Sequence, residues 1–270
     1  LPGKNVTPVT EKMLKNIQPG GFIFFGFNLS SHEQTRRFIR DLQDASIKNG
    51  GLPLFISVDQ EGGRVVRVMD GVTQFPGAMA AGVAGREDYV HEWGRILGME
   101  LRSTGFNMNF APVLDVNNNP DNPVINTRSF GPDPVLVARL GTVYIKGLQK
   151  SGCMAVCKHF PGHGDTNSDS HVTLPVVPFG PDRLDKIEWI PFRAAIREDV
   201  SAVMTAHIAF PLLLGNNDPA TISPFFLTEV LRKRMAYRGL VITDDMEMKG
   251  VSGGREPGEA AVRAVMAGAD

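Results

Sequence analysis

Short apolar runs alternate with longer amphipathic segments along the whole chain. Continuous apolar runs bounded by polar residues or glycine are typical of strands buried on both faces, whereas apolar residues at spacings of three and four predict helices. We expect strands at 22–25, 54–58, 107–116, 153–157, 202–205 and 239–243. We expect helices at about 30–47, 88–103, 134–150, 183–197, 224–235 and 259–266.

This alternation predicts a parallel sheet covered by helices. Polar or charged residues stand at the carboxyl ends of most predicted strands: Asp59, Asp115, Lys158, His159, His207 and Asp244. A doubly wound sheet would gather its site at one switch point, whereas an α/β barrel draws on many strand ends. The pattern therefore favours an α/β fold of the (β/α)8 TIM-barrel type. Since six strands are predicted and both chain ends are abrupt, we expect 1–270 to be one trimmed barrel domain, with a strand missing at each end.

Composition limits the possible partners and compartments. Hydrophobic residues make up 42%, charged residues 21%, and the formal net charge is −1. These values give no electrostatic reason to expect nucleic acid or an anionic membrane surface as a partner. No apolar run is long enough for a membrane span and no signal-peptide pattern opens the chain, although a start at Leu1 leaves a removed leader open. Cys153 and Cys157, about 13 Å apart along one strand, are expected to be core thiols, and we expect a cytoplasmic monomer.

The loop at 158–171 carries the strongest chemical signal. It holds three of the six histidines and two aspartates. Asp169 can orient His171, which can then exchange a proton near neutral pH; the alternative is that both are ordinary polar loop residues. A metal site is a further alternative, with ligands drawn from His159, His163, Asp165, Asp169 and His171. Pro and Gly at 161–162 interrupt the helical spacing of the first two histidines, so we predict catalysis without metal or cofactor.

Two other strand ends offer carboxylates. Of Asp244 and Asp245, one is expected to point into the barrel mouth and the other to cap a helix or pair with Lys249. An inward carboxylate can attack an electrophilic carbon or stabilise a cation. Asp59 precedes a pair of glycines and could accept hydrogen bonds from sugar hydroxyls. The arginines at 64, 67 and 128 could equally be surface charges.

These segments together resemble the β-N-acetylglucosaminidases (β-hexosaminidases) of glycoside hydrolase family 3, the type with an Asp-His acid/base dyad. The resemblance rests on KHFPGHG at 158–164 followed by DSH at 169–171, and it covers the length of the chain. The other matching segments are VDQEGGRV at 58–65, NFAPVLDV at 109–116, RSFG at 128–131, VMTAH at 203–207 and ITDDM at 242–246.

The resemblance implies a role for each matching residue. Asp244 corresponds to the nucleophile, His171 to the general acid/base, and Asp169 to the partner of that histidine. The residues that correspond to the sugar-binding set are Asp59, Arg67, Arg128, Lys158 and His159. The family barrel has eight strands, and nothing in this chain corresponds to the second domain that many members carry.

The implied reaction is hydrolysis with retention, through a covalent glycosyl-Asp244 intermediate. The implied substrate is a terminal β-linked N-acetylglucosamine in a peptidoglycan or chitin fragment. A histidine places no permanent negative charge beside the leaving group, so a phosphorylase that uses phosphate as the acceptor is an alternative. A metal-dependent barrel hydrolase and a non-catalytic sugar-binding barrel are the others, although the latter would have lost Asp244 or His171, and both are present.

Overall fold

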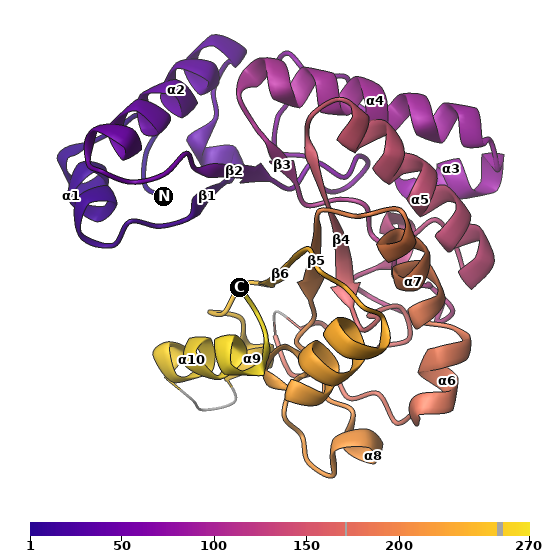
Figure 1. The fold of residues 1–270 in the computed structure, drawn as a ribbon. Helices are drawn as coiled ribbons and strands as arrows, with labels where there is room; N and C mark the ends of the chain where they lie inside the picture. The colour runs from indigo at the N-terminus through magenta and orange to yellow at the C-terminus, as the bar shows by residue number, and fades with distance from the viewer. Residues whose placement is uncertain (171, 253–255) are drawn as a thin grey trace.

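A computed structural model describes residues 1–170, 172–252 and 256–270, and these form a curved parallel sheet with helices outside it (Figure 1). The six strands follow one another in the sheet in sequence order, and each pairs in parallel with its neighbours. They are β1 (Gly21–Phe24), β2 (Phe55–Val58), β3 (Met108–Asn109), β4 (Met154–Phe160), β5 (Ala202–Thr205) and β6 (Leu240–Thr243). This arrangement is a half-barrel: within the described residues β1 and β6 are unpaired edges, and both chain ends lie on that open side.

Helices surround the sheet (Figure 1). They are α1 (Pro8–Asn16), α2 (His32–Lys48), α3 (Ala78–Ala84), α4 (Glu87–Thr104), α5 (Pro134–Lys150), α6 (Pro181–Lys186), α7 (Trp189–Arg197), α8 (Pro211–Leu214), α9 (Lys249–Ser252) and α10 (Pro257–Ala267). A π-helix, η4, spans Phe225–Arg234, and short 3-10 turns lie at Gly26–Asn28 (η1), Asn126–Arg128 (η2) and Ala220–Ile222 (η3). The helix predicted at 183–197 is therefore two helices, and α1, α3, α8 and α9 were not predicted.

The strand predicted at 107–116 is much shorter in the structure. Regular pairing stops after Asn109, and Pro112 has no N–H to donate to a neighbouring strand. The chain nevertheless stays beside β4, because the Leu114 N–H donates to the Lys158 carbonyl at 2.7 Å. The irregular segment thus delivers Asp115 to the carboxyl end of β4. The strand predicted at 153–157 continues to Phe160, so Lys158 and His159 lie within β4, where its pairing with β5 shifts register.

Glycines allow α4 and α5 to pack closely. A Cβ added at Gly147 of α5 would lie 2.2 Å from the His91 carbonyl oxygen of α4, and one at Gly94 would lie 2.4 Å from the Tyr144 carbonyl oxygen. Real Cβ atoms do not approach so closely, so these positions need hydrogen in place of a side chain. The contact holds the helices that support β3 and β4.

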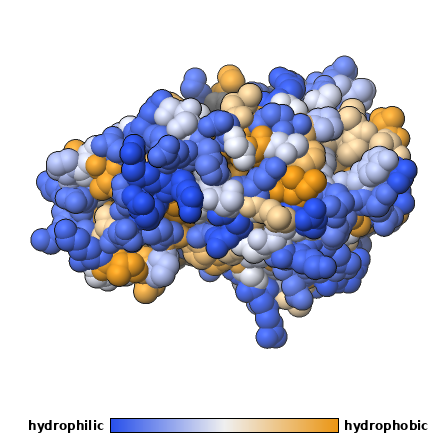
Figure 2. Space-filling model, turned by 90° about the horizontal axis from the view of Figure 1, so that it is seen from above, coloured by the Kyte–Doolittle hydropathy of each residue, from blue (hydrophilic) through white to orange (hydrophobic). Residues whose placement is uncertain are grey.

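The core of the described residues has three parts, one of which packs Ile222, Val251, Ala260 and Ala264 together. Helix faces and the outer faces of the strands form the larger cluster, in which Trp93 contacts Phe75, Phe130 and Tyr144. A smaller cluster on the inner strand faces contains Met108, Val156, Ala202 and Met204. Cys153 and Cys157 are buried free thiols, as predicted. The face in Figure 2 is mostly hydrophilic, with hydrophobic side chains in separate small patches. None of the helices in the described ranges combines the length and apolar character needed to cross a membrane.

Candidate active site

The carboxyl ends of the strands surround a cavity of about 1030 Å³. Because all six strands are parallel, these ends meet at one edge of the sheet. The cavity continues along the inner strand faces to Gly21, Phe55 and Leu240 at the amino ends of β1, β2 and β6, and residues of α10 also line it. Six predicted site residues line it: Asp59, Arg67, Arg128, Lys158, His159 and Asp244. Of these, Arg67 lies on the loop that follows β2.

A buried amide shapes the loop after β2. Gln60 accepts hydrogen bonds from the backbone N–H groups of Arg67 and Val68 at 2.8 and 2.9 Å. The Gln60 backbone N–H donates to Asn109 Oδ1 at 3.0 Å, and the Asn109 side-chain N–H donates to the Gln60 carbonyl at 2.9 Å. The loop therefore folds back over the strand end, with Asp59 and Glu61 directed at the cavity.

A cluster of opposite charges lines the cavity. The Lys158 Nζ lies 2.7 Å from Asp59 Oδ1 and 2.6 Å from Glu61 Oε1. Glu61 also accepts two hydrogen bonds from Arg128, at 2.9 and 2.8 Å, in a bidentate pair. Lys158 is 2% exposed and Glu61 7% exposed, so solvent screens these contacts little.

The opposite charges of the cluster shift one another's pKa values and so counteract the effect of burial. Burial raises the pKa of Glu61, but Lys158 and Arg128 oppose this more strongly and lower the pKa to about 2. Burial lowers the pKa of Lys158, yet Asp59 and Glu61 raise it above its usual value. The pKa of Arg128 is likewise raised, since Glu61 outweighs burial. Glu61, Arg128 and Lys158 are therefore ionised at neutral pH, and the cluster offers fixed donors and acceptors to a polyhydroxylated ligand.

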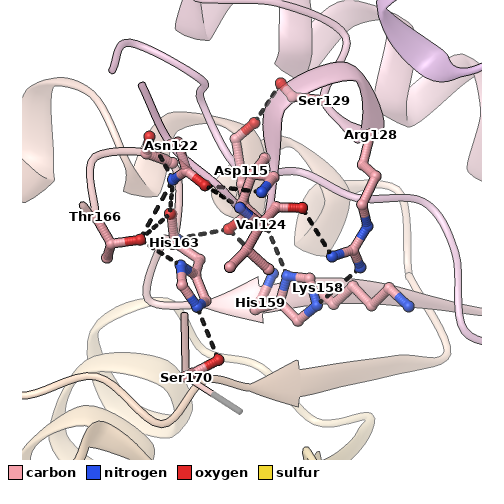
Figure 3. A network of polar contacts seen from close by, with 12 residues as sticks. Asp115, Asn122, Val124, Arg128, Ser129, Lys158, His159, His163, Thr166 and Ser170 are labelled. Carbon is pink, nitrogen blue, oxygen red and sulfur yellow. Dashed lines mark hydrogen bonds and ion pairs between the residues drawn. The ribbon is translucent and has the colours of Figure 1, made fainter. Parts of the chain in front are cut away.

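A buried aspartate orients His159 of β4 and holds the backbone of His163, which follows β4 (Figure 3). Asp115 Oδ2 lies 2.6 Å from His159 Nδ1, and Asp115 Oδ1 accepts from the backbone N–H groups of His159 and His163 at 3.2 and 2.7 Å. Burial raises the pKa of Asp115, but the two histidines lower it overall. An ionised carboxylate can only accept, so His159 carries a proton on Nδ1. Its Nε2 then lies 3.4 Å from an Arg128 nitrogen, at the edge of the charge cluster.

Asp244 immediately follows β6, and its Oδ1 accepts a 2.9 Å hydrogen bond from the Asp245 N–H. Burial raises the pKa of Asp244, but His159, His207 and Lys158 lower it overall. Asp244 is therefore ionised at neutral pH, as a nucleophile must be. Asp245 is exposed and accepts from the Glu247 N–H at 2.9 Å.

His207 holds the backbone of the segment that begins at Asp244. Its Nε2 donates to the Asp245 carbonyl at 2.9 Å, and its Nδ1 lies 2.9 Å from Thr221 Oγ1. Burial lowers the pKa of His207 despite the neighbouring Asp244. The Thr221 hydroxyl also donates to the Ala206 carbonyl at 2.9 Å, so its single proton is shared between that carbonyl and His207 Nδ1.

The predicted acid/base, His171, lies outside the described residues. Asp169 lies within them, partly exposed, and its backbone carbonyl accepts from the Val172 and Thr173 N–H groups. The roles of Asp169, His171 and the cavity residues remain predictions. Where the structure describes the chain, no group of His, Cys, Asp and Glu side chains is arranged to hold a metal ion. Catalysis without metal also remains a prediction.

Sequence reasoning gave no individual role to Glu61 and Asn109, and it named Asp115, His163 and His207 as candidates without predicting that they act as supports. Glu61 stands two positions after Asp59, so both can approach the same lysine. Asp115 and His207 stood at predicted strand ends, which was a usable signal. Nothing in the sequence indicates that Asp115 contacts His159 and His163 rather than a ligand.

Three comparisons place these features among known proteins. The model of the glycosyl hydrolase family 3 N-terminal domain matches residues 2–270. The chain is 37% identical to the β-hexosaminidase A of Pseudoalteromonas piscicida, across 97% of this chain and 47% of that protein. It is 35% identical to a β-hexosaminidase of Neisseria meningitidis serogroup B, across 92% and 69%. The chain thus spans about half the length of the first of these relatives.

Solved structures agree with this match. A glycoside hydrolase family 3 β-N-acetylglucosaminidase from Paenibacillus sp. superposes with a TM-score of 0.96 at 47% identity, over 99% of this chain and 52% of that one. NagZ from Neisseria gonorrhoeae in complex with N-trifluoroacetyl-D-glucosamine superposes with a TM-score of 0.91 at 32% identity, over 100% and 78%.

Proposed function

The chain belongs to family 3 of the glycosyl hydrolases, and from this membership we propose that it acts as a retaining, exo-acting β-N-acetylglucosaminidase. The observation that carries the proposal is that the ionised Asp244 lines the same cavity as the Lys158–Asp59–Glu61 charge cluster. The activities of the β-hexosaminidase and β-N-acetylglucosaminidase relatives support it. The substrate is a terminal β-linked N-acetylglucosamine in a peptidoglycan or chitin fragment.

The charge cluster binds the terminal sugar. Asp59 accepts hydrogen bonds from hydroxyls, and Lys158 and Arg128 donate to hydroxyl oxygens. Arg67 has no guanidinium partner among the described residues, so it can close over the sugar. His159, oriented by Asp115, presents its Nε2 atom to the sugar.

The reaction takes place in two displacements. A carboxylate oxygen of Asp244 bonds to the anomeric carbon as the glycosidic bond breaks, and His171 gives its proton to the leaving oxygen. A water molecule then attacks the same carbon, His171 takes its proton, and the bond to Asp244 breaks. Two inversions give net retention. Asp169 supports the charge that His171 gains and loses.

Product analysis tests the proposal. A chromogenic β-N-acetylglucosaminide should release the chromophore and β-N-acetylglucosamine, observed by NMR before mutarotation. Equal rates with and without phosphate indicate that water is the acceptor, whereas a sugar 1-phosphate would assign the phosphorylase alternative. Absence of any release by a folded, full-length protein would refute glycosidase activity.

A second experiment separates the two catalytic groups. An activated aryl leaving group needs little protonation, so His171→Ala should retain a burst of aryl alcohol while losing about 10²–10⁴-fold on a natural glycoside. Asp244→Ala should abolish both. An equal loss of the burst in both variants would show that the roles are assigned wrongly.

The proposal extends to the barrel, the oligomeric state and the compartment of the whole protein. Residues 1–270 belong to one catalytic domain. That domain is a complete (β/α)8 barrel, in which further β/α units join β6 to β1. The protein is a cytoplasmic monomer. Light scattering of the full-length protein and fractionation of the source cells test these statements.

A further inference from the structure

Asn122 is a buried amide whose hydrogen bonds join two segments at the carboxyl edge of the sheet (Figure 3). Its Nδ2 donates to the carbonyls of His163 and Gly164 at 2.8 and 3.0 Å. Its Oδ1 accepts from the backbone N–H groups of Val124 and Ile125 at 2.9 and 2.8 Å. Because Asn122 is only 1% exposed, water competes little for these bonds. The amide therefore fixes where the turn at 122–125 begins relative to the residues that follow β4.

The same turn carries Arg128. The Ile125 carbonyl accepts a hydrogen bond from the Arg128 backbone N–H at 2.9 Å, and the Val124 carbonyl accepts one from Arg128 Nη1 at 3.4 Å. Asn122 thus holds the N–H groups of the two residues whose carbonyls hold Arg128. Ile125 is fully buried, so the turn cannot move without disturbing the packing around that side chain. The position of the Arg128 backbone therefore depends on the Asn122 amide.

Ser129 anchors the other side of Arg128. Its buried Oγ donates to the Asp115 carbonyl at 2.6 Å and accepts from the Gly131 N–H at 3.1 Å. Asp115 also orients His159, whose Nε2 lies 3.4 Å from Arg128 Nη2. Both anchors therefore place Arg128 relative to the end of β4, where the predicted sugar-binding residues gather.

We propose that Asn122 is a positioning residue that aims Arg128 at the cavity. Glu61 holds the tip of the Arg128 side chain through two hydrogen bonds, and the Asn122 turn holds its backbone. A long side chain has many rotamers, and fixing both of its ends leaves few of them. Ser129 performs the same task from the other end of the turn. This inference rests on the proposed function, in which Arg128 binds the terminal sugar.

Asn122→Ala in the full-length protein removes the amide from the turn. KM for a chromogenic β-N-acetylglucosaminide should rise by about ten-fold, with less than about a two-fold change in kcat, because a hydroxyl contact of Arg128 is the same before and during the reaction. Asn119→Ala is the matched control, since that amide contacts the Thr166 carbonyl and the Asp121 N–H, outside the turn. An unchanged KM in Asn122→Ala, or an equal rise in the control, would overturn the proposal.

A double-mutant cycle tests whether Asn122 acts through Arg128. In an Arg128→Ala background, the further change Asn122→Ala should raise KM by less than about two-fold, because the side chain that it positions is gone. A rise as large as in the wild-type background would show that Asn122 acts by another route, and it would contradict the proposal. Ser129→Ala allows the same cycle if Asn122→Ala does not fold.

Hydrogen exchange at the Arg128 side chain makes the test independent of activity. Arg128 Nε donates to Glu61 Oε2 at 2.9 Å, so its proton should exchange slowly with water. By NMR, this proton should exchange roughly ten-fold faster in Asn122→Ala and Ser129→Ala than in the wild type and Asn119→Ala. If the wild type releases no sugar, the proposed function fails, while this exchange still decides whether Asn122 positions Arg128. Unchanged exchange in both variants would refute the positioning role whatever the activity.

Discussion

Replacing Glu61 with glutamine would test the charge cluster at its most connected residue. Glu61 contacts Lys158 at 2.6 Å and holds Arg128 through two hydrogen bonds. Glutamine has nearly the same size and keeps one acceptor oxygen, so the change removes the negative charge with little change in volume. Lys158 and Arg128 would remain buried, with less negative charge nearby to compensate their positive charges.

The pKa of Glu61 gives the magnitude. It is lowered from 4.5 to about 2, a difference of about 2.5 pH units. Each unit corresponds to about 1.36 kcal/mol, so the ionised carboxylate contributes roughly 3 kcal/mol to the free energy of unfolding at pH 7. Because the pKa is lower in the folded state, this contribution is present above pH 4.5 and disappears as the pH falls through 2. At pH 3 about 1 kcal/mol should remain.

Urea unfolding of the wild type and Glu61→Gln at pH 7, 5 and 3 measures this contribution. The difference in unfolding free energy should be largest at pH 7 and shrink by more than half at pH 3. Glu92→Gln is the control, because its pair with Arg95 is half-exposed and should contribute nothing measurable. A Glu61→Gln difference below about 0.5 kcal/mol at pH 7, or one independent of pH, would refute the reasoning, because attraction would then not exceed the cost of burial.

Three other changes have defined outcomes. Asp115→Asn replaces one acceptor with a donor against His159 Nδ1, so KM for an aryl glycoside should rise by about ten-fold; an unchanged KM would remove His159 from sugar binding. Gly147→Ala should lower the free energy of unfolding by roughly 1–3 kcal/mol, whereas Gly258→Ala should not lower it; equal urea midpoints would contradict the close contact of α4 and α5. Exhaustive chelation should leave glycosidase activity intact, and loss restored by zinc would overturn His171 as a free acid/base.

The arrangement of the strands was largely predictable. Apolar runs marked five of the six strands to within a few residues, and strict alternation with helices predicted the parallel order. Parallel strands place their carboxyl ends at one edge, so Asp59, Lys158 and Asp244 could be expected together before any contact was known. Periodicity could not predict the division of 183–197 into α6 and α7, because both parts keep their apolar residues inward.

The contacts within the site were decided only by tertiary structure. The motif at 158–164 marked His159 and His163 as candidates, but the pattern is the same whether a histidine faces a ligand or a buried partner. Asp115 decides between these outcomes by accepting from both residues, and it reaches them because the chain leaves regular pairing before Pro112 and runs on beside β4. Periodicity along a chain reports which face is buried, whereas the partner of a polar side chain depends on segments brought together from far apart. The sequence alone therefore determined the sheet and the edge where chemistry gathers, and the folded structure determined which side chains are held as supports and which are left to face the cavity.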